Sequence, residues 1–317
     1  MSTPTMRIAI VWNPSKTEKD VLSDALAEVL PDAAGDVLWF ETTAEDPGRG
    51  AAAAALETGA ELLIVAGGDG TVRAVAEYVA DSGSDVEVAI IPLGTGNLFA
   101  RNLDVPVNDV PGAFRRALEG DAHAVDVGWV EVADAGDVSR HGFVVMLGFG
   151  LDAQMIVETD DDLKARVGWL AYVESLGRAV SGSETLSFTI TADDGPERVE
   201  TGHTLLVGNC GTLQGGVTLM PEADPSDGEL DYVVVSAEGL AQWLATVKTI
   251  VWDHGVKRLV GSGEKAAPAD TESLSRGRAS TLAVSLPEPR LLEIDGEELG
   301  ETREFTVTVQ PSALRVR

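Results

Sequence analysis

The chain has 317 residues and 44% of them are hydrophobic, which is enough for two domains with a sizeable core. Its 52 acidic and 23 basic residues give a formal charge of −29, which argues against a nucleic-acid-binding face and a basic membrane-binding surface. The sequence has no apolar run of the roughly 20 residues that a membrane-spanning helix requires, no signal-peptide pattern, and a single cysteine, Cys210. We therefore expect a cytoplasmic protein without intrachain disulfides and without nucleic-acid partners.

The first third of the chain alternates apolar segments with segments of helical periodicity. Strands are predicted at residues 7–12, 36–41, 61–66 and 86–91. Helices are predicted at residues 17–30, 47–58 and 71–80. Strand, turn and helix repeated in this order predict a parallel sheet with short connections.

After about residue 124 the pattern changes to segments in which apolar and polar residues alternate, as around Phe305, Val307 and Val309. Strands are predicted at residues 124–132, 141–147, 185–191, 202–208, 229–236, 280–286, 290–295 and 304–310. Helices are predicted at residues 163–181 and 240–259, and an exposed loop at residues 261–278. The predicted fold class is therefore α/β plus β-sandwich, with the antiparallel sandwich in the second part of the chain.

The strongest chemical signal is the sequence Gly-Gly-Asp-Gly-Thr at residues 67–71, between a buried strand and a helix. Glycines allow the backbone to approach a phosphate closely, and the free N–H groups of the following helix point to the same place. Asp69 does not suit a phosphate, so we expect it to hold Mg²⁺, bond a ribose or accept a proton. The alternative is a plain tight turn in which Asp69 caps the helix.

Two further strand ends carry similar chemistry. The sequence Pro-Leu-Gly-Thr-Gly-Asn at residues 92–97 follows the fourth strand, and Asn-Pro-Ser at residues 13–15 follows the first. Because the carboxyl ends of parallel strands meet at one edge of a sheet, these turns predict a joint site for a polyphosphate. No GxxxxGK[ST] sequence occurs, so this is not a P-loop enzyme. The GxGxxA match at residues 148–153 lies in the β-rich part, where a dinucleotide fingerprint is not expected.

These motifs resemble those of a known family. Residues 67–71 resemble a signature shared by diacylglycerol kinases, sphingosine kinases, NAD kinases and, more distantly, phosphofructokinases, whereas residues 92–101 resemble a block of the lipid kinases only. Residues 148–153, residues 209–228 and the Asp-Gly-Glu sequence at residues 295–297 resemble further lipid-kinase blocks in the same order. Over nearly its whole length, the chain is therefore similar to the diacylglycerol kinase and sphingosine kinase-like bacterial lipid kinases.

The resemblance implies a NAD-kinase-like α/β nucleotide domain, a β-sandwich lipid-substrate domain and ATP in the cleft between them. It places the first domain at residues 1–124, joined by residues 303–317 returning to it, and the second at residues 125–302. The implied reaction is the ATP-dependent phosphorylation of a lipid hydroxyl, on diacylglycerol or a related lipid, with Mg²⁺. The implied partners are ATP, a lipid at the membrane surface and, in a homodimer, a second copy of the chain.

The resemblance also assigns roles to single residues. Asp295 is the candidate acceptor of the lipid hydroxyl proton, Glu297 a metal ligand or orienting group, and Asp69 acts through Mg²⁺ or the phosphates. The residues expected to hold ATP are Asn13, Gly67, Gly68, Gly70, Thr71, Thr95, Gly96 and Asn97. Asp227, with Asp224, resembles a second Mg²⁺ site with a structural role. Taken alone, the Asp-Gly-Glu sequence also reads as a hairpin turn.

Three departures from the family pattern leave alternatives open. Leu98 stands where the family has an aspartate, residues 13–17 lack the glycines that often follow this motif, and one glycine of the block around Gly215 is replaced. Leu98 and the altered first motif favour, as an alternative, a non-catalytic family member that binds nucleotide or lipid. An NAD kinase is the nearest enzyme alternative, since it shares residues 67–71 but not the lipid-kinase blocks.

Because the chain is so acidic, contact with a membrane must be hydrophobic or must use locally clustered arginines. The two amphipathic segments carry Trp169 and Trp243, which are candidates for the edge of a lipid groove or for contact with the bilayer interface. Packing of both segments on the sandwich is the simpler alternative. The sequence does not identify the acceptor lipid.

Overall fold

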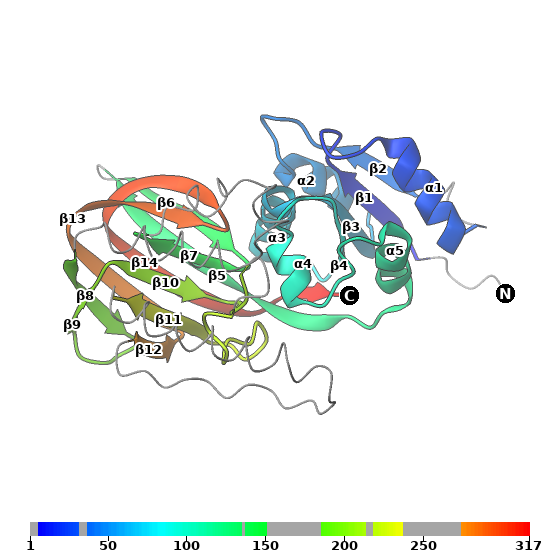
Figure 1. Cartoon of the computed structure of the whole chain (residues 1–317). Coiled ribbons are helices and arrows are strands. Elements are labelled where there is room, and N and C mark those ends of the chain that lie inside the picture. Colours follow the sequence, from blue (N-terminus) through cyan, green and yellow to red (C-terminus); the bar gives the residue numbers. More distant parts are fainter. Residues whose placement is uncertain (1–5, 32–36, 135–136, 151–184, 214–217, 237–273) are drawn as a thin grey trace, which may run out of the picture.

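The computed structural model describes residues 6–31, 37–134, 137–150, 185–213, 218–236 and 274–317 (Figure 1). Its strands form one mixed sheet of 14 strands, with the helices gathered around one end and the sandwich at the other. The predicted helices at 163–181 and 240–259, and with them Trp169 and Trp243, lie outside the described residues.

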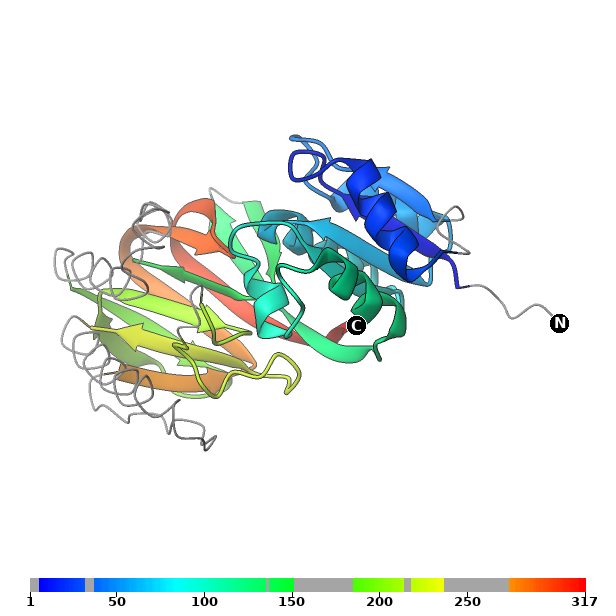
Figure 2. The ribbon, with the colours of Figure 1, turned by 45° about the vertical axis from the view of Figure 1, so that its right-hand side comes forward.

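The first end of the sheet is parallel, in the order β4-β3-β1-β2. Its strands are β1 Ile8–Trp12, β2 Leu38–Glu41, β3 Leu62–Gly67 and β4 Glu87–Pro92. Its helices are α1 Lys19–Val29, α2 Arg49–Glu57, α3 Asp69–Ser82, α4 Leu98–Asn102 and α5 Val110–Glu119. Helix α1 packs beside α5, and α2 beside α3, with one pair on each face of the sheet (Figure 2). Every residue of β1 and β3 is buried, which explains why these strands are continuously apolar.

The second end of the sheet is antiparallel and encloses its own apolar core. Its strands are β5 His123–Asp134, β6 Asp137–Phe143, β7 Met146–Phe149, β8 Leu186–Ala192, β9 Arg198–Gly202, β10 Thr204–Gly208, β11 Leu230–Val235, β12 Leu274–Ala279 and β13 Thr281–Ile294. Alternate residues of β13, namely Leu282, Val284 and Leu286, point into this core. Phe149 and Phe188 meet edge to face there, with ring centroids 5.2 Å apart. The predicted α/β plus β-sandwich class is confirmed.

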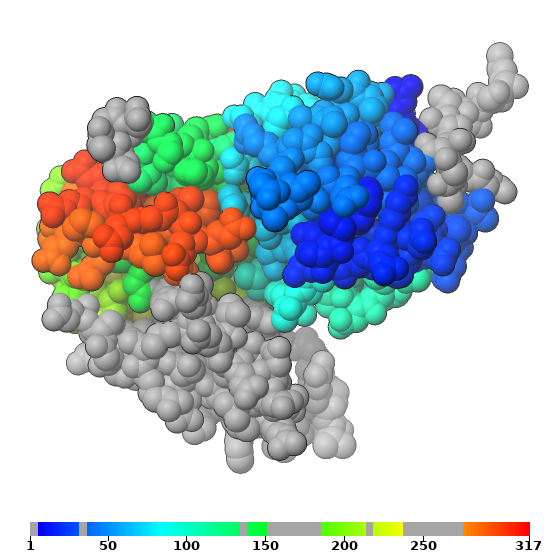
Figure 3. Space-filling view, turned by 90° about the horizontal axis from the view of Figure 1, so that it is seen from above, coloured from blue at the N-terminus to red at the C-terminus, as the bar shows by residue number. Residues whose placement is uncertain are grey.

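Strand β14, Glu297–Val316, connects the two ends. It pairs antiparallel with β13 and β5, and its last residues, Arg315 and Val316, pair in parallel with β4. The carboxyl terminus therefore lies at the edge of the first sheet (Figure 1). Figure 3 shows the orange strands near the end of the sequence on one side and the blue amino-terminal part of the chain on the other. The domain limits at residues 124 and 303 stay predictions, because β5 and β14 contribute residues to both cores.

Two predicted boundaries differ from the structure. The two strands predicted at residues 280–286 and 290–295 are one strand, β13, with a register irregularity between Ser285 and Arg290. Pro287 and Pro289 cause the interruption, because proline cannot donate to the ladder, yet an irregularity lets the strand continue. The end of the predicted loop at 261–278 is strand β12, which pairs with β11.

Candidate active site

The turns that follow β1, β3 and β4 meet at the carboxyl edge of the first sheet. Asn13, after β1, donates from Nδ2 to the hydroxyl of Thr71 over 3.2 Å, and its Oδ1 accepts from the backbone N–H of Ser15. The backbone N–H of Leu93, after β4, donates to the carbonyl of Gly67 over 2.8 Å. The structure therefore brings together the three turns that the sequence singled out.

Two glycines make the closest approach between these turns. A Cβ atom on Gly94 would lie 2.8 Å from the Cα of Gly68, a distance that real Cβ atoms essentially never show. A Cβ on Gly67 would likewise meet the side chain of Thr71 at 2.7 Å. Glycine is therefore required at positions 94 and 67, and the backbone stays bare there, as the close approach of a phosphate would need. The Lys16 side chain reaches over the same place, with its Cε 3.7 Å from a Cβ built on Gly68.

Asp69 joins the second and third turns. Its Oδ2 accepts from the backbone N–H of Asn97 over 2.7 Å, and its Oδ1 from that of Leu98 over 2.6 Å. Although Asp69 is the first residue of α3, its carboxylate thus caps the start of α4, the helix of the next turn. Gly96 stays close beside it, since a Cβ there would lie 2.9 Å from Oδ2 of Asp69.

Asn97 fixes the shape of the third turn. It has a left-handed φ of 50°, and its side chain bonds the backbone N–H of Gly94 over 2.8 Å and the carbonyl of Gly94 over 2.7 Å. Thr95, in the same turn, is exposed. Asn97 therefore determines the shape of the turn, while Thr95 and Gly96 form its more accessible part.

Asp295 and Gly296 form the tight turn between β13 and β14. Their φ angles are 47° and 86°, and Ile294 pairs with Glu297, as in a two-residue hairpin. The Asp295 carboxylate is 8% exposed and accepts three backbone hydrogen bonds of 2.9–3.0 Å. The donors are Val144, Val145 and Met146. Burial raises the pKa of Asp295 to about 6, although these hydrogen bonds and the charge of Arg73 act to lower it.

Glu297 brings the turn between β13 and β14 into contact with the glycine turn at the start of α3. Its Oε1 lies 2.5 Å from the position that a Cβ on Gly70 would take, so the carboxylate sits directly over the start of α3. Its Oε2 forms an ion pair with Arg73 of α3, across 224 residues of sequence. The Glu297 side chain is 47% exposed, so it is the more accessible of the two carboxylates of this turn.

Asp224 and Asp227 lie in a separate turn before β11. Asp224 accepts from the backbone N–H and the hydroxyl of Ser226, at 3.0 and 2.6 Å. Asp227 forms an ion pair with Arg278, whose guanidinium also contacts Glu229 and Asp231. Arg278 thus supplies positive charge beside Asp227 but does not contact Asp224, and the Mg²⁺ site at these two residues stays a prediction. Across the described residues, no group of three or more His, Cys, Asp or Glu side chains is placed to hold a metal ion.

The sequence did not predict two residues that hold neighbouring segments together. Asp126 of β5 is 1% exposed and accepts backbone hydrogen bonds of 2.7 Å from Gly228 and Ser312, so it ties β14 to the turn before β11. A carboxylate among the apolar residues of 124–130 was the available signal for it. Asn102 at the end of α4 exchanges two hydrogen bonds with the backbone of Thr212, and nothing in the sequence marks that contact.

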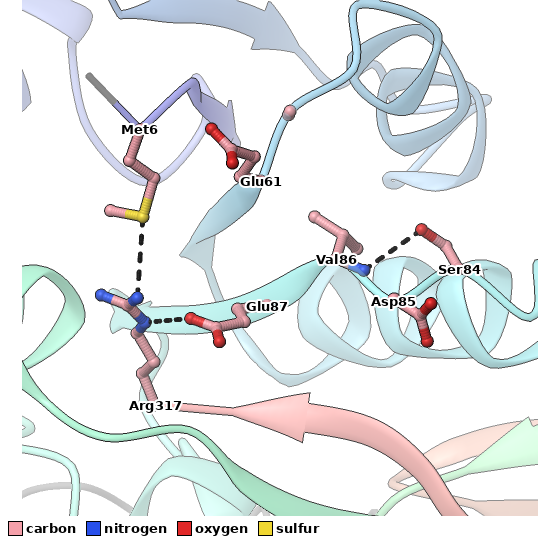
Figure 4. A pocket seen from close by; sticks show the side chains of 8 residues that line it. Met6, Glu61, Ser84, Asp85, Val86, Glu87 and Arg317 are labelled. Atoms are coloured by element: carbon pink, nitrogen blue, oxygen red, sulfur yellow. Dashed lines mark hydrogen bonds and ion pairs between the residues drawn. The ribbon is translucent and has the colours of Figure 1, made fainter. Parts of the chain in front are cut away.

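A cavity of about 540 Å³ lies at the opposite edge of the first sheet, where β3 and β4 begin (Figure 4). Arg317 reaches into it, donating from Nε to Glu87 over 2.5 Å, with its Nη2 3.6 Å from the sulfur of Met6. None of the predicted site residues lines this cavity. Its contacts hold the carboxyl terminus against the sheet.

Glycine turns at the carboxyl edge of a parallel sheet are where α/β proteins bind nucleotide phosphates, and here a carboxylate turn from a β-sandwich faces them. The family model for the diacylglycerol kinase catalytic domain matches residues 7–130. The model for the YegS C-terminal NAD kinase beta sandwich-like domain matches residues 145–317. The chain belongs to the family of YegS-like and diacylglycerol kinase-like lipid kinases, which confirms the resemblance.

Individual relatives agree with this assignment. A "Probable lipid kinase YegS-like" of Pseudomonas aeruginosa is 32% identical over 285 residues, which cover 89% of this chain and 85% of the relative. A "Diacylglycerol kinase" of Staphylococcus epidermidis is 30% identical over 241 residues, or 74% of this chain and 72% of the relative. A solved diacylglycerol kinase structure from Bacillus anthracis has a TM-score of 0.68 at 21% identity and covers 99% of this chain and 97% of its own. At that identity the structural match supports the fold alone.

Proposed function

We propose that the protein transfers the γ-phosphoryl group of ATP to a hydroxyl group of a lipid, diacylglycerol or a related one. The observation that carries the proposal is the position of Glu297, which places a carboxylate from the sandwich over the phosphate-binding start of α3. A phosphoryl acceptor bound against the sandwich would then meet a phosphate held by the glycine turns.

The ATP phosphates are assigned to the three turns at the carboxyl edge. The start of α3 offers free N–H groups at Gly70 and Thr71, and Gly68 and Gly94 leave the backbone bare. Asn13 orients the Thr71 hydroxyl, and Thr95 and Gly96 complete the cradle. Mg²⁺ bound with the nucleotide would neutralise charge on the phosphates during transfer. Asp69 serves by holding the third turn against the second.

The proton of the lipid hydroxyl is assigned to Glu297. Both oxygens of Asp295 accept hydrogen bonds from backbone N–H groups, and the side chain is buried. We therefore assign Asp295 the structural role of fixing the turn between β13 and β14. The Glu297 carboxylate is more accessible and faces the phosphate end. Phosphoryl transfer has a loose transition state, which needs a positioned acceptor rather than a strong base. This exchanges the roles that the sequence resemblance gave to the two residues.

The site of action remains part of the proposal. Among the helices that the structure describes, none is long and apolar enough to cross a membrane. We place the enzyme in the cytoplasm, in peripheral contact with the bilayer that holds its lipid, with Trp169 and Trp243 as candidate contacts. A homodimer is a further prediction.

The proposal is tested by phosphoryl transfer from labelled ATP with Mg²⁺ to mixed micelles that carry a panel of lipids, with NAD in a parallel tube. We expect a labelled lipid with the wild-type protein. Glu297→Gln should lower kcat by about 10²–10⁴-fold, the usual range for a lost proton acceptor. Asp295→Asn should mainly lower thermal stability.

Other results would replace the proposal with a stated alternative. Labelled NADP with no labelled lipid would make the protein an NAD kinase. ATP binding without any labelled product would identify a non-catalytic member of the family. A Glu297→Gln protein with wild-type kcat, beside an inactive Asp295→Asn protein, would return the proton acceptor to Asp295.

A further inference from the structure

Helix α3 carries a row of charged side chains, one turn apart, along its contact with the sandwich. Arg73 pairs with Glu77 at 3.3 Å, and Glu77 pairs with Arg49 of α2 at 3.2 Å. Asp81 pairs at 3.1 Å with both Arg49 and Arg140 of β6. The row becomes more buried toward the active site, with Arg73 12% exposed and Asp81 43% exposed. Arg73 is thus its most sheltered member.

The Arg73 guanidinium lies between two carboxylates and pairs with both. Its Nη1 pairs with Glu77, and its Nη2 pairs with Glu297 of the sandwich turn. Glu77 is itself confined, since a Cβ on Gly142 of β6 would lie 2.9 Å from its Cγ. Arg73 is therefore held by Glu77 on one side, and its Nη2 is the donor that reaches Glu297.

Glu297 depends on this contact for its orientation. Within the described part of the chain, Arg73 is the one side chain that forms an ion pair or hydrogen bond with its carboxylate. A half-exposed glutamate without a partner would sample several rotamers, and the phosphates at the start of α3 would repel it. The cation removes both difficulties, because it fixes the rotamer over Gly70 and offsets the negative charge.

We propose that Arg73 is a positioning residue, which holds the Glu297 carboxylate over the start of α3 and so couples the sandwich turn to the nucleotide turn. The inference rests on the proposed function, in which Glu297 accepts the proton. Burial raises the pKa of neighbouring Asp295, and the Arg73 charge is among the effects that lower it, so this charge reaches the whole turn.

The test compares Arg73→Met with Arg73→Lys and with Arg49→Met, which removes a cation from the exposed end of the same row. Arg73→Met should lower kcat about 100-fold, the loss that a displacement of about 1 Å near the reacting groups can cause. The KM for ATP should change little, and Arg73→Lys should recover part of kcat. Arg49→Met should keep wild-type kinetics. Wild-type kcat in Arg73→Met would overturn the inference.

The double variant separates positioning from an independent catalytic role. If Arg73 acts through Glu297, then Arg73→Met combined with Glu297→Gln should be no slower than Glu297→Gln alone. A further full loss in the double variant would overturn the inference.

A second measurement does not depend on turnover. The shifts of the urea midpoint for Arg73→Met and Glu297→Gln should be non-additive, and additive shifts would count against the pairing itself. Absence of labelled lipid with the wild-type protein would count against the proposed function instead, and the stability cycle would still decide whether the two residues are coupled.

Discussion

Oδ2 of Asp69 accepts a hydrogen bond of 2.7 Å from the backbone N–H of Asn97, so the acidic residue of the first glycine turn holds the second glycine turn in place. Oδ1 does the same for Leu98. The carboxylate is thereby an internal brace between the two turns, a role that accounts for a negative charge beside the proposed phosphate site. The capping alternative raised by the sequence was close to this arrangement, but the helix that Asp69 caps is α4.

Replacing Asp69 by asparagine tests the brace. The amide offers one acceptor oxygen for two backbone donors, and an unsatisfied buried donor costs about 1–3 kcal/mol. We expect a lower melting temperature and a higher KM for ATP, with a smaller change in the KM for lipid. Asp121→Asn, at an exposed site after α5, is the control and should change neither. A large loss of kcat with an unchanged melting temperature and KM for ATP would instead give Asp69 a part in the chemical step.

The contact between Gly68 and Gly94 predicts a sharp steric effect. Gly94→Ala places a Cβ 2.8 Å from the Cα of Gly68, so the two turns must separate. Overpacking of this kind costs about 1–3 kcal/mol. If that cost falls on the nucleotide-bound state, ATP affinity should drop by about tenfold for each 1.4 kcal/mol. Calorimetric titration with ATP measures it.

Gly83→Ala is the matched control for Gly94→Ala. Gly83 ends α3 with a φ of 63° and has open space around it, so alanine there should cost stability without weakening ATP binding. Equal losses of ATP affinity in the two variants would show that a general loss of stability, rather than the contact between the turns, is responsible.

The glycine turns could be predicted from the sequence because their signal is local. A buried strand, a glycine cluster and a helix follow one another within about ten residues, and parallel strands place such turns at one edge. The contacts that complete the site are not local. Arg73 and Glu297 are 224 residues apart, and no spacing rule connects a helix to a hairpin at that distance. The family resemblance brought Glu297 to attention, but it gave no partner for it.

The residues of the hairpin illustrate the same limit in another way. Asp-Gly at 295–296 predicts a two-residue turn by its φ preferences, and the structure has that turn. The burial of Asp295 beneath the backbone of residues 144–146 depends on how β7 meets β13, which periodicity does not determine. The sequence predicts two strands in place of β13 for a related reason. Pro287 and Pro289 are typical of a strand end, but in the structure the strand continues past them with an irregular register.

The raised pKa of Asp295 predicts a pH-dependent contribution to stability. Burial raises it from 3.8 to about 6 in the folded protein, so the folded state binds the proton more tightly than the unfolded state. The stability contributed is complete below pH 4 and is lost as the pH rises through 6. The difference between the pKa values of the two states corresponds to about 3 kcal/mol, at 1.36 kcal/mol for each pKa unit.

Asp295→Asn provides the measurement, because asparagine does not titrate. It should be less stable than the wild type at pH 4, and the gap in the free energy of unfolding should narrow between pH 4 and pH 6.5. Urea unfolding at each pH compares the two proteins, so the general effect of the acidic chain cancels. A gap that widens over this range would mean that the carboxylate is ionised at a low pKa, stabilised by its three hydrogen bonds.

Arg278 predicts how the turn before β11 responds to magnesium. Its guanidinium pairs with Asp227, Glu229 and Asp231, and Asp231 has a pKa raised by burial despite that cation. With Arg278 in place, EDTA should leave the melting temperature of the nucleotide-free wild type unchanged.

Arg278→Met leaves the carboxylates to repel one another, so the melting temperature should fall and Mg²⁺ should partly restore it by binding the folded state. Arg303→Met, which removes an exposed arginine of β14, should show neither effect. If EDTA destabilises the wild type and Mg²⁺ reverses this, a cation binds beside Asp224 and Asp227 as the family resemblance implied, and Arg278 does not take its place.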